Sequence, residues 1–204
     1  MKNLKMDTKK NYTNYEIERK FLIRMPDIEK LESDPRIEKI RICQTYLQPG
    51  LHQPIEKVFP GNAPEEERQT QEKVAGRSSN RRIRKWTENG KSKYIYTSKI
   101  KLSAIKRLET EFEIDAEQYH QLMEEKDPNS ITLEKSRYRI YEKGFCFELD
   151  LFPFWKRQAY LEIELPSEDT SFDLPDFIEV IREVTEEEGY SNFALAHQIP
   201  PEEI

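Results

Sequence analysis

Apolar and charged residues alternate with a period of two along much of this chain. Between Tyr15 and Ile23 the apolar side chains fall on one face, and Glu16, Glu18 and Lys20 fall on the other. This alternation is typical of a half-buried β-strand. The same pattern predicts seven further strands, over Ile40–Leu47, Arg81–Trp86, Lys93–Lys101, Arg107–Asp115, Lys135–Tyr141, Phe145–Phe152 and Tyr160–Leu165. The chain is therefore expected to be mainly β.

Two short turns and a few helical patches complete the pattern. Asn89-Gly90 is the strongest hairpin signal, because both residues tolerate the positive φ angles of a tight turn. Lys143-Gly144 marks a second turn between neighbouring strands. Helical spacing predicts four segments: Pro26 to about Leu31, Ala116–Lys126, Asp176–Val184 and Asn192–His197.

The length of 204 residues suits one domain with a sizeable core. Residues 1–13 are polar and basic, which predicts a flexible N-terminal tail. Residues 48–80 are rich in proline and carry an acidic run, so this stretch is expected to be a loop insertion. The folded domain is predicted to span residues 14–204.

Composition narrows the range of partners. The net charge of −6 offers no global basic field for nucleic acid, so a bound anion needs local clusters of Lys and Arg. Two distant cysteines predict neither a disulfide framework nor a metal site, which favours a reduced, cytoplasmic setting. No apolar run has the length of a membrane span. We expect no nucleic-acid or membrane partner, and a monomer or homodimer.

Charged residues make up 35% of the chain, and they recur in pairs on the polar faces of the strands. Residues two apart on a strand lie about 6.5–7 Å apart on the same face. Acidic pairs at this spacing can present oxygen ligands to a hard cation, and basic pairs can bind successive phosphoryl groups. Exposed sheet faces also carry charges. The residues alone therefore leave an exposed face and an enclosed site equally open.

The order of these motifs resembles the CYTH superfamily, the triphosphate tunnel metalloenzymes. Glu16, Glu18 and Lys20 match its ExExK signature. Further matching motifs follow in order, at Gln44–Leu47, Arg82–Arg84, Thr97–Lys99, Arg107–Glu111, Glu134–Tyr138, Phe147–Asp150 and Leu161–Glu164. The resemblance covers about Tyr15 to Ala196. It implies a closed eight-stranded antiparallel β-barrel, a tunnel with a charged interior and flanking helices.

The resemblance also implies roles for the charged residues. The implied ligands of Mg²⁺ or Mn²⁺ are Glu16, Glu18, Asp150, Glu162 and Glu164. The implied substrate-binding residues are Lys20, Arg82, Arg84, Lys99, Lys101, Arg107, Arg137 and Arg139. Glu109, Glu111 and Glu148 are expected to complete the charged network. The expected catalytic residues are Tyr46, Glu18 and Lys99, although Tyr46 could equally be a packing residue of the tunnel wall.

The function implied is metal-dependent hydrolysis of the terminal phosphate of inorganic triphosphate or a nucleoside triphosphate. An adenylyl cyclase of the same fold is an alternative, although no adenine pocket is recognisable in the sequence. A non-catalytic module for polyphosphate or nucleotide is another, although the carboxylate pairs argue against it. The sequence departs from the family pattern in the insertion after Leu47 and at Phe193, which stands where a basic residue is often found.

Overall fold

A computed structural model describes residues 12–48, 50–51, 78–101 and 106–204. Within these ranges the side chains of residues 12–16, 50–51, 78–79, 101 and 106–108 are not described. Most of the predicted tail and most of the predicted insertion therefore lie outside the described residues. In the part of the chain that is described, no helix is long and apolar enough to cross a membrane.

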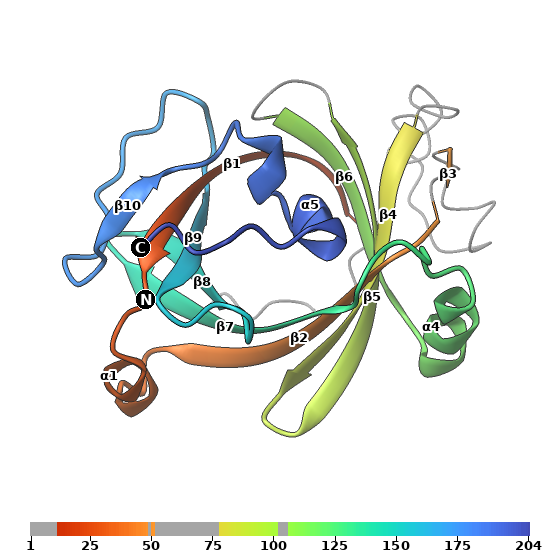
Figure 1. Cartoon of the computed structure of the whole chain (residues 1–204), viewed down its shortest axis with the longest axis horizontal. Helices are drawn as coiled ribbons and strands as arrows, with labels where there is room; N and C mark the ends of the chain where they lie inside the picture. Colours follow the sequence, from red (N-terminus) through yellow and green to blue (C-terminus); the bar gives the residue numbers. More distant parts are fainter. Residues whose placement is uncertain (1–11, 49, 52–77, 102–105) are drawn as a thin grey trace.

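Eight long antiparallel strands surround a common interior (Figure 1). They are β1 (Tyr12–Arg24), β2 (Glu38–Tyr46), β4 (Ser78–Glu88), β5 (Lys91–Lys101), β6 (Lys106–Ile114), β7 (Leu133–Glu142), β8 (Phe145–Leu151) and β9 (Gln158–Glu164). Their order in space is β1-β6-β5-β4-β2-β7-β8-β9. The first half of β1 pairs with β6 and its second half pairs with β9, so the pairing runs round all eight strands. This confirms the predicted tunnel-like barrel.

Both predicted turns connect neighbouring strands. The turn between β4 and β5 places Asn89 at φ 49° and Gly90 at φ 76°, and the turn between β7 and β8 places Lys143 at φ 52° and Gly144 at φ 85°. Two successive residues with positive φ give the backbone twist that suits a tight hairpin. A further short strand, β3 (Gly50–Leu51), pairs with the beginning of β4.

Two large apolar clusters of strand residues lie outside the ring, each covered by a helix. On one side Ile83 and Phe112 pack against α4 (Ala116–Met123), whose N-cap Asp115 forms a capping box with Gln118. On the other side a larger cluster lies beneath α1 (Ile28–Ser33), which Asp27 caps. This cluster contains Phe21, Leu149 and Ile163. Because strand side chains alternate, burying these residues outside the ring turns the charged faces inward.

The helix predicted over Asp176–Val184 is wrong. Residues Val180–Glu183 form β10, which pairs with β1 through Phe21↔Glu183 and Leu22↔Arg182. None of these four residues is a glycine or proline that would break a helix. The β-branched side chains of Val180 and Ile181 suit a strand, and the edge of β1 offers unpaired backbone groups. Tertiary pairing therefore overrides the local spacing.

The predicted C-terminal helix is present. Its sequence did not predict where the helix packs in the fold. The 3₁₀ turn η1 (Glu188–Tyr190) leads into α5 (Asn192–His197), and α5 lies across the interior of the ring (Figure 1). Leu195 and Ala196 are buried there against the inward-facing side chains of Leu133 and Tyr160. One end of the ring is thus filled by an apolar cluster, and the charged part of the interior lies beyond it.

Candidate active site

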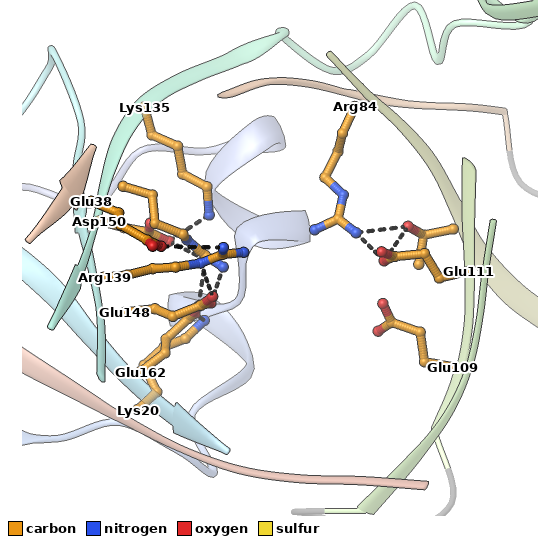
Figure 2. A network of polar contacts seen from close by, with 12 residues as sticks. Lys20, Glu38, Arg84, Glu109, Glu111, Lys135, Arg139, Glu148, Asp150 and Glu162 are labelled. Atoms are coloured by element: carbon orange, nitrogen blue, oxygen red, sulfur yellow. Dashed lines mark hydrogen bonds and ion pairs between the residues drawn. The ribbon is translucent and has the colours of Figure 1, made fainter. Parts of the chain in front are cut away.

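The interior of the barrel holds a cavity of about 1140 Å³. It is lined by the inward faces of the eight long strands and by the segment that leads into α5. Figure 2 shows two groups of charged side chains projecting from opposite walls of this space. One group comes mainly from β1, β7, β8 and β9, and the other from β4, β5 and β6.

The first group is centred on Arg137 of β7. Its guanidinium forms a bidentate pair with Asp150, with Nε–Oδ1 and Nη2–Oδ2 distances of 2.7 Å each. Nη2 also donates to Glu162 Oε2 at 2.9 Å, and Nη1 donates to Glu148. Burial opposes the charge of Arg137, but these carboxylates outweigh it and raise its pKa well above the usual value. The guanidinium therefore ties β7, β8 and β9 together.

Two lysines complete this first group. Lys135 is buried beside Arg137 and donates to Asp150. Burial, assisted by the charge of Arg137, lowers the pKa of Lys135 to about 8. Lys20 lies 2.7 Å from Glu162 (Nζ–Oε1). Burial opposes its charge, yet Glu162 and the nearby Glu18 carboxylate hold the pKa of Lys20 above its ordinary value.

The carboxylates of this group stay ionised for the same reason. Asp150 has no exposed surface, and burial alone would favour its protonated form. The positive charges of Arg137 and Lys135 outweigh this effect of burial and lower the pKa of Asp150. Glu162 behaves likewise, because Lys20 and Arg137 lower its pKa well below the usual value. The cluster is therefore a set of fixed charges of both signs.

The opposite wall carries the second group. Arg84 donates to Glu111 and, at 3.1 Å, to Thr97 Oγ1. The carboxylate of Glu109 forms ion pairs with Lys99 and Arg82, and the distance from its Oε1 to Arg82 Nη2 is 3.5 Å. Burial lowers the pKa of Arg84 to about 10, and Glu111 only partly offsets this effect. The buried Nε of Arg84 has no hydrogen-bond partner among the described residues, so this guanidinium has capacity left for an anion.

Tyr46 lies between the two groups, near α5. Its hydroxyl accepts a hydrogen bond of 2.9 Å from Gln44 Nε2. Burial raises its pKa, although the charge of Arg82 partly offsets the effect. The ring meets Phe193 edge-on at 5.1 Å between centroids. Phe193, the departure from the family pattern, therefore supports the ring of Tyr46 from the side of the C-terminal helix.

Comparisons with known proteins agree with this arrangement. No protein-family model matches the sequence. A curated relative, the inorganic triphosphatase of Acetivibrio thermocellus, is 35% identical over 115 residues, which cover 56% of this chain and 69% of the relative. This chain belongs to the CYTH family of triphosphate tunnel metalloenzymes.

The fold comparison covers more of the chain. The protein NE1496, in a crystal structure that describes it as hypothetical, has a TM-score of 0.50 and 27% identity, over 91% of this chain and 99% of NE1496. A second crystal structure, with a TM-score of 0.48, 27% identity and the same coverage, names NE1496 an inorganic triphosphatase. The CYTH family is generally metal-dependent.

The CYTH motifs converge on the cavity. The predicted residues that line it are Glu18, Lys20, Tyr46, Arg82, Arg84, Lys99, Glu109, Glu111, Arg137, Arg139, Glu148, Glu162 and Glu164. Asp150 is buried behind this lining, in contact with Lys135 and Arg137. The side chains of Glu16, Lys101 and Arg107 lie outside the described residues. Arg139 lies 3.5 Å from Glu148 and 3.8 Å from Glu38.

The carboxylates fit a divalent ion that shares its coordination with phosphate. Glu18 of β1 and Glu164 of β9 are direct cross-strand partners, and both line the cavity. Among the residues that the structure describes, no three His, Cys, Asp or Glu side chains are grouped to hold an ion by themselves. Mg²⁺ is usually bound by one or two carboxylates together with water and substrate phosphates. The pair Glu18 and Glu164 meets that requirement.

Three parts of the site escaped prediction from the sequence. Lys135 shares its strand face with Arg137 and Arg139, so the period of two could have identified it. Trp86 also lines the cavity, with Lys93 Nζ 4.5 Å and Arg139 Cζ 5.1 Å from its ring centroid. The cavity wall formed by residues 184–194 carried no sequence signal, because it depends on where the C-terminal segment folds back.

Proposed function

We propose that this protein hydrolyses the terminal phosphate of inorganic triphosphate or a nucleoside triphosphate, with Mg²⁺ or Mn²⁺. The observation that carries the proposal is the cavity itself, in which basic side chains on opposite walls face a common space beside carboxylates. A chain of three phosphates is a compact polyanion, and opposed cationic walls can contact it from two sides. The curated relative that is named an inorganic triphosphatase supports the same activity.

The basic residues would act mainly through electrostatics. Phosphoryl transfer depends on positioning and on stabilising charge at the phosphate oxygens, and preorganised cations do both. Arg84 can offer its free Nε, and Lys20 and Arg137 are already fixed by carboxylates. Because these side chains are held before substrate arrives, they need little reorganisation during the reaction. Tyr46 and Lys135 both line the cavity and would be the candidates for contact with the attacking water.

A divalent metal ion would bind at the carboxylates of the cavity. Glu18 and Glu164 would hold the ion, with Glu16 as a further predicted ligand on the same strand face. A bound divalent ion neutralises phosphate charge and lowers the pKa of bound water. Asp150 and Glu162, which are also predicted ligands, would keep the basic side chains in place as long as their present ion pairs persist.

The test is a phosphate-release assay with inorganic triphosphate and ATP, each with Mg²⁺ and Mn²⁺. Hydrolysis of ATP gives phosphate and ADP, whereas a cyclase gives cyclic AMP and pyrophosphate. Arg84→Ala should lower kcat/KM by about 10²–10³, the cost of losing one preorganised donor to a charged transition state. Glu18→Gln should abolish metal-dependent turnover.

Lys85→Ala is the matched control, because Lys85 follows Arg84 on β4 and so points to the opposite face of the strand. It should leave kcat/KM within about twofold, since most surface substitutions have small effects. Circular dichroism and thermal unfolding would establish that each variant is folded. Full activity of folded Arg84→Ala and Glu18→Gln would reject the tunnel as the active site.

A further inference from the structure

The chain beyond α5 runs back across the ring toward β9 and β10 (Figure 1). We call residues 200–204 the C-terminal strap. The backbone carbonyl of Pro200 accepts a hydrogen bond of 3.2 Å from Trp155 Nε1, and the backbone N–H of Glu203 donates to Gln158 Oε1 at 2.8 Å. Two hydrogen bonds from the strap's backbone therefore fix its path beside the beginning of β9.

Glu202 adds a second attachment to the same region. Its Oε1 accepts hydrogen bonds from the backbone N–H groups of Lys156 and Arg157, at 2.5 and 2.6 Å. Its Oε2 lies 3.2 Å from Arg157 Nε. These contacts hold the strap against the loop between β8 and β9 and leave the side chain of Glu203 directed to β10 and η1.

Glu203 connects β10 with η1, and η1 lines the cavity. Its carboxylate forms a bidentate pair with Arg182 of β10, with Nε–Oε2 and Nη2–Oε1 distances of 2.9 and 2.8 Å. The same carboxylate accepts a hydrogen bond from the hydroxyl of Tyr190 in η1. Arg182 Cζ also lies 4.8 Å from the centroid of the Tyr190 ring. The hydrogen bond from Arg182 is the main reason that the pKa of Glu203 falls to about 2.

Tyr190 lies in the wall of the cavity that we call the roof, residues 184–193. Its backbone carbonyl accepts a hydrogen bond of 3.5 Å from Lys20 Nζ, the lysine of the ExExK motif. The roof also forms hydrogen bonds with the backbone of Lys20. Val184 N donates to Lys20 O at 2.9 Å, and Lys20 N donates to Thr185 Oγ1 at 3.0 Å. Lys20 is therefore held by Glu162 on one side and by the roof on the other.

We propose that Glu203 is a positioning residue, which holds Tyr190 and the roof in the geometry that sets Lys20 for binding phosphate. The inference rests on the proposed function and assigns a role in it to a side chain outside the cavity. Exposed single ion pairs contribute little to stability, but a carboxylate shared by a bidentate arginine and a tyrosine hydroxyl is a network. We expect this network to limit the local opening of the roof more than it raises the free energy of unfolding of the whole protein.

The test compares Glu203→Gln with Glu179→Gln. Glu179 forms an exposed ion pair with Arg24 just before β10, and it does not contact the roof, so it controls for the loss of a surface charge nearby. In Glu203→Gln, amide hydrogen exchange of residues 184–193 should become at least severalfold faster. KM for triphosphate should rise on the order of tenfold with kcat within about twofold, the pattern of lost binding. Glu179→Gln should change neither.

A double-mutant cycle with Tyr190→Phe isolates the link, because residues in one hydrogen-bonded network are non-additive. Glu203→Gln with Tyr190→Phe should raise KM little more than either change alone. The same cycle with Glu179→Gln should be additive. Unchanged exchange of the roof in Glu203→Gln, or additive effects of Glu203→Gln and Tyr190→Phe, would overturn the proposal.

The exchange measurement also separates this inference from the proposed function. It needs no turnover, so an inactive wild-type protein would reject triphosphate hydrolysis while the exchange rates still decide whether Glu203 orders the roof. An active wild-type enzyme whose KM and exchange rates are indifferent to Glu203→Gln would reject the positioning role alone.

Discussion

At the scale of single residues, the tunnel depends on buried charges that neutralise one another. Asp150 is fully buried and Lys135 has 3% of its side chain exposed, yet both carry charge. Replacing one member of such a cluster leaves its partners charged, buried and unmatched. The charged interior is therefore a condition for folding as well as for binding.

Asp150→Asn tests this dependence. The substitution keeps the size of the side chain but removes the charge that Lys135 and Arg137 share. We expect the free energy of unfolding to fall by about 3–5 kcal/mol, the usual cost of breaking a buried ion pair from one side. Urea titration at neutral pH measures it.

Glu179→Gln is again the comparison, since it removes a carboxylate from an exposed ion pair. Its cost should stay below about 1 kcal/mol. If the two substitutions destabilised the protein equally, the buried cluster could not be the source of the effect. The comparison therefore shows whether the cost comes from the buried position of the carboxylate or from the loss of any carboxylate.

Most of the residue-level site could be predicted because strand faces alternate. Once Arg82 and Arg84 share a face, the period of two determines which residues of that strand face the cavity. What alternation cannot determine is whether that face is enclosed. Enclosure depends on closing the ring through β1 and on apolar clusters outside it, and both are properties of the whole chain.

At the scale of elements, the C-terminal segment is the part that local sequence predicted least. The helix Asn192–His197 was expected, but its place inside the ring was not. Val180–Glu183 became a strand because β1 provided a partner along its edge. Both outcomes come from contacts between residues far apart in the sequence, such as Lys20 with Thr185 and Tyr46 with Phe193. Patterns within a window of the sequence do not contain this information.

One contact of α5 is expected to depend on pH. His197 Nδ1 lies 2.8 Å from the carbonyl oxygen of Phe193, and Nε2 lies 3.1 Å from Asp127 Oδ2. The hydrogen bond to Phe193 is the main cause that raises the pKa of His197, and Asp127 adds to it. The pKa of Asp127 is lowered, so its carboxylate is ionised near neutral pH. The imidazolium form of His197 thus stabilises the folded state.

The sign of the effect follows from linkage. A group whose pKa is raised on folding contributes its full stabilisation below its unfolded pKa, about 6.5 for His, and loses it as pH rises through the folded pKa. Between about pH 6 and pH 8.5, wild-type stability should therefore fall more than that of His197→Gln. Urea titrations across this range measure the difference. A difference that stayed constant or grew with pH would contradict the assignment.

At the scale of the whole molecule, the barrel is divided along its axis by polarity. One end is filled by α5, whose Leu195 packs in one apolar cluster with Leu133 and Tyr160, and the charged cavity lies beyond it. Outside the ring, the apolar clusters beneath α1 and α4 supply the burial that a usual core would supply. The middle of the interior is thus available for a charged ligand because much of the hydrophobic core lies outside the barrel.

This division predicts a large response of stability to ligand. Inorganic triphosphate with a divalent ion would bind the folded chain and not the unfolded one, which adds RT ln(1 + [L]/Kd) to the free energy of unfolding. At a hundredfold excess over Kd the gain is about 2.7 kcal/mol. For a domain of this size, each kcal/mol raises Tm by about 2–4 °C, so a shift on the order of 5–10 °C is expected.

Sulfate at equal ionic strength provides the control that decides the meaning of that shift. General screening acts on exposed charges, whereas buried pairs such as Lys135–Asp150 are screened much less. A Tm that rises with the logarithm of triphosphate concentration, and that Arg84→Ala weakens, would therefore indicate occupation of the cavity. Sulfate and triphosphate producing the same shift would instead mean that the anion acts on the outer surface, and the enclosed charges would need another explanation.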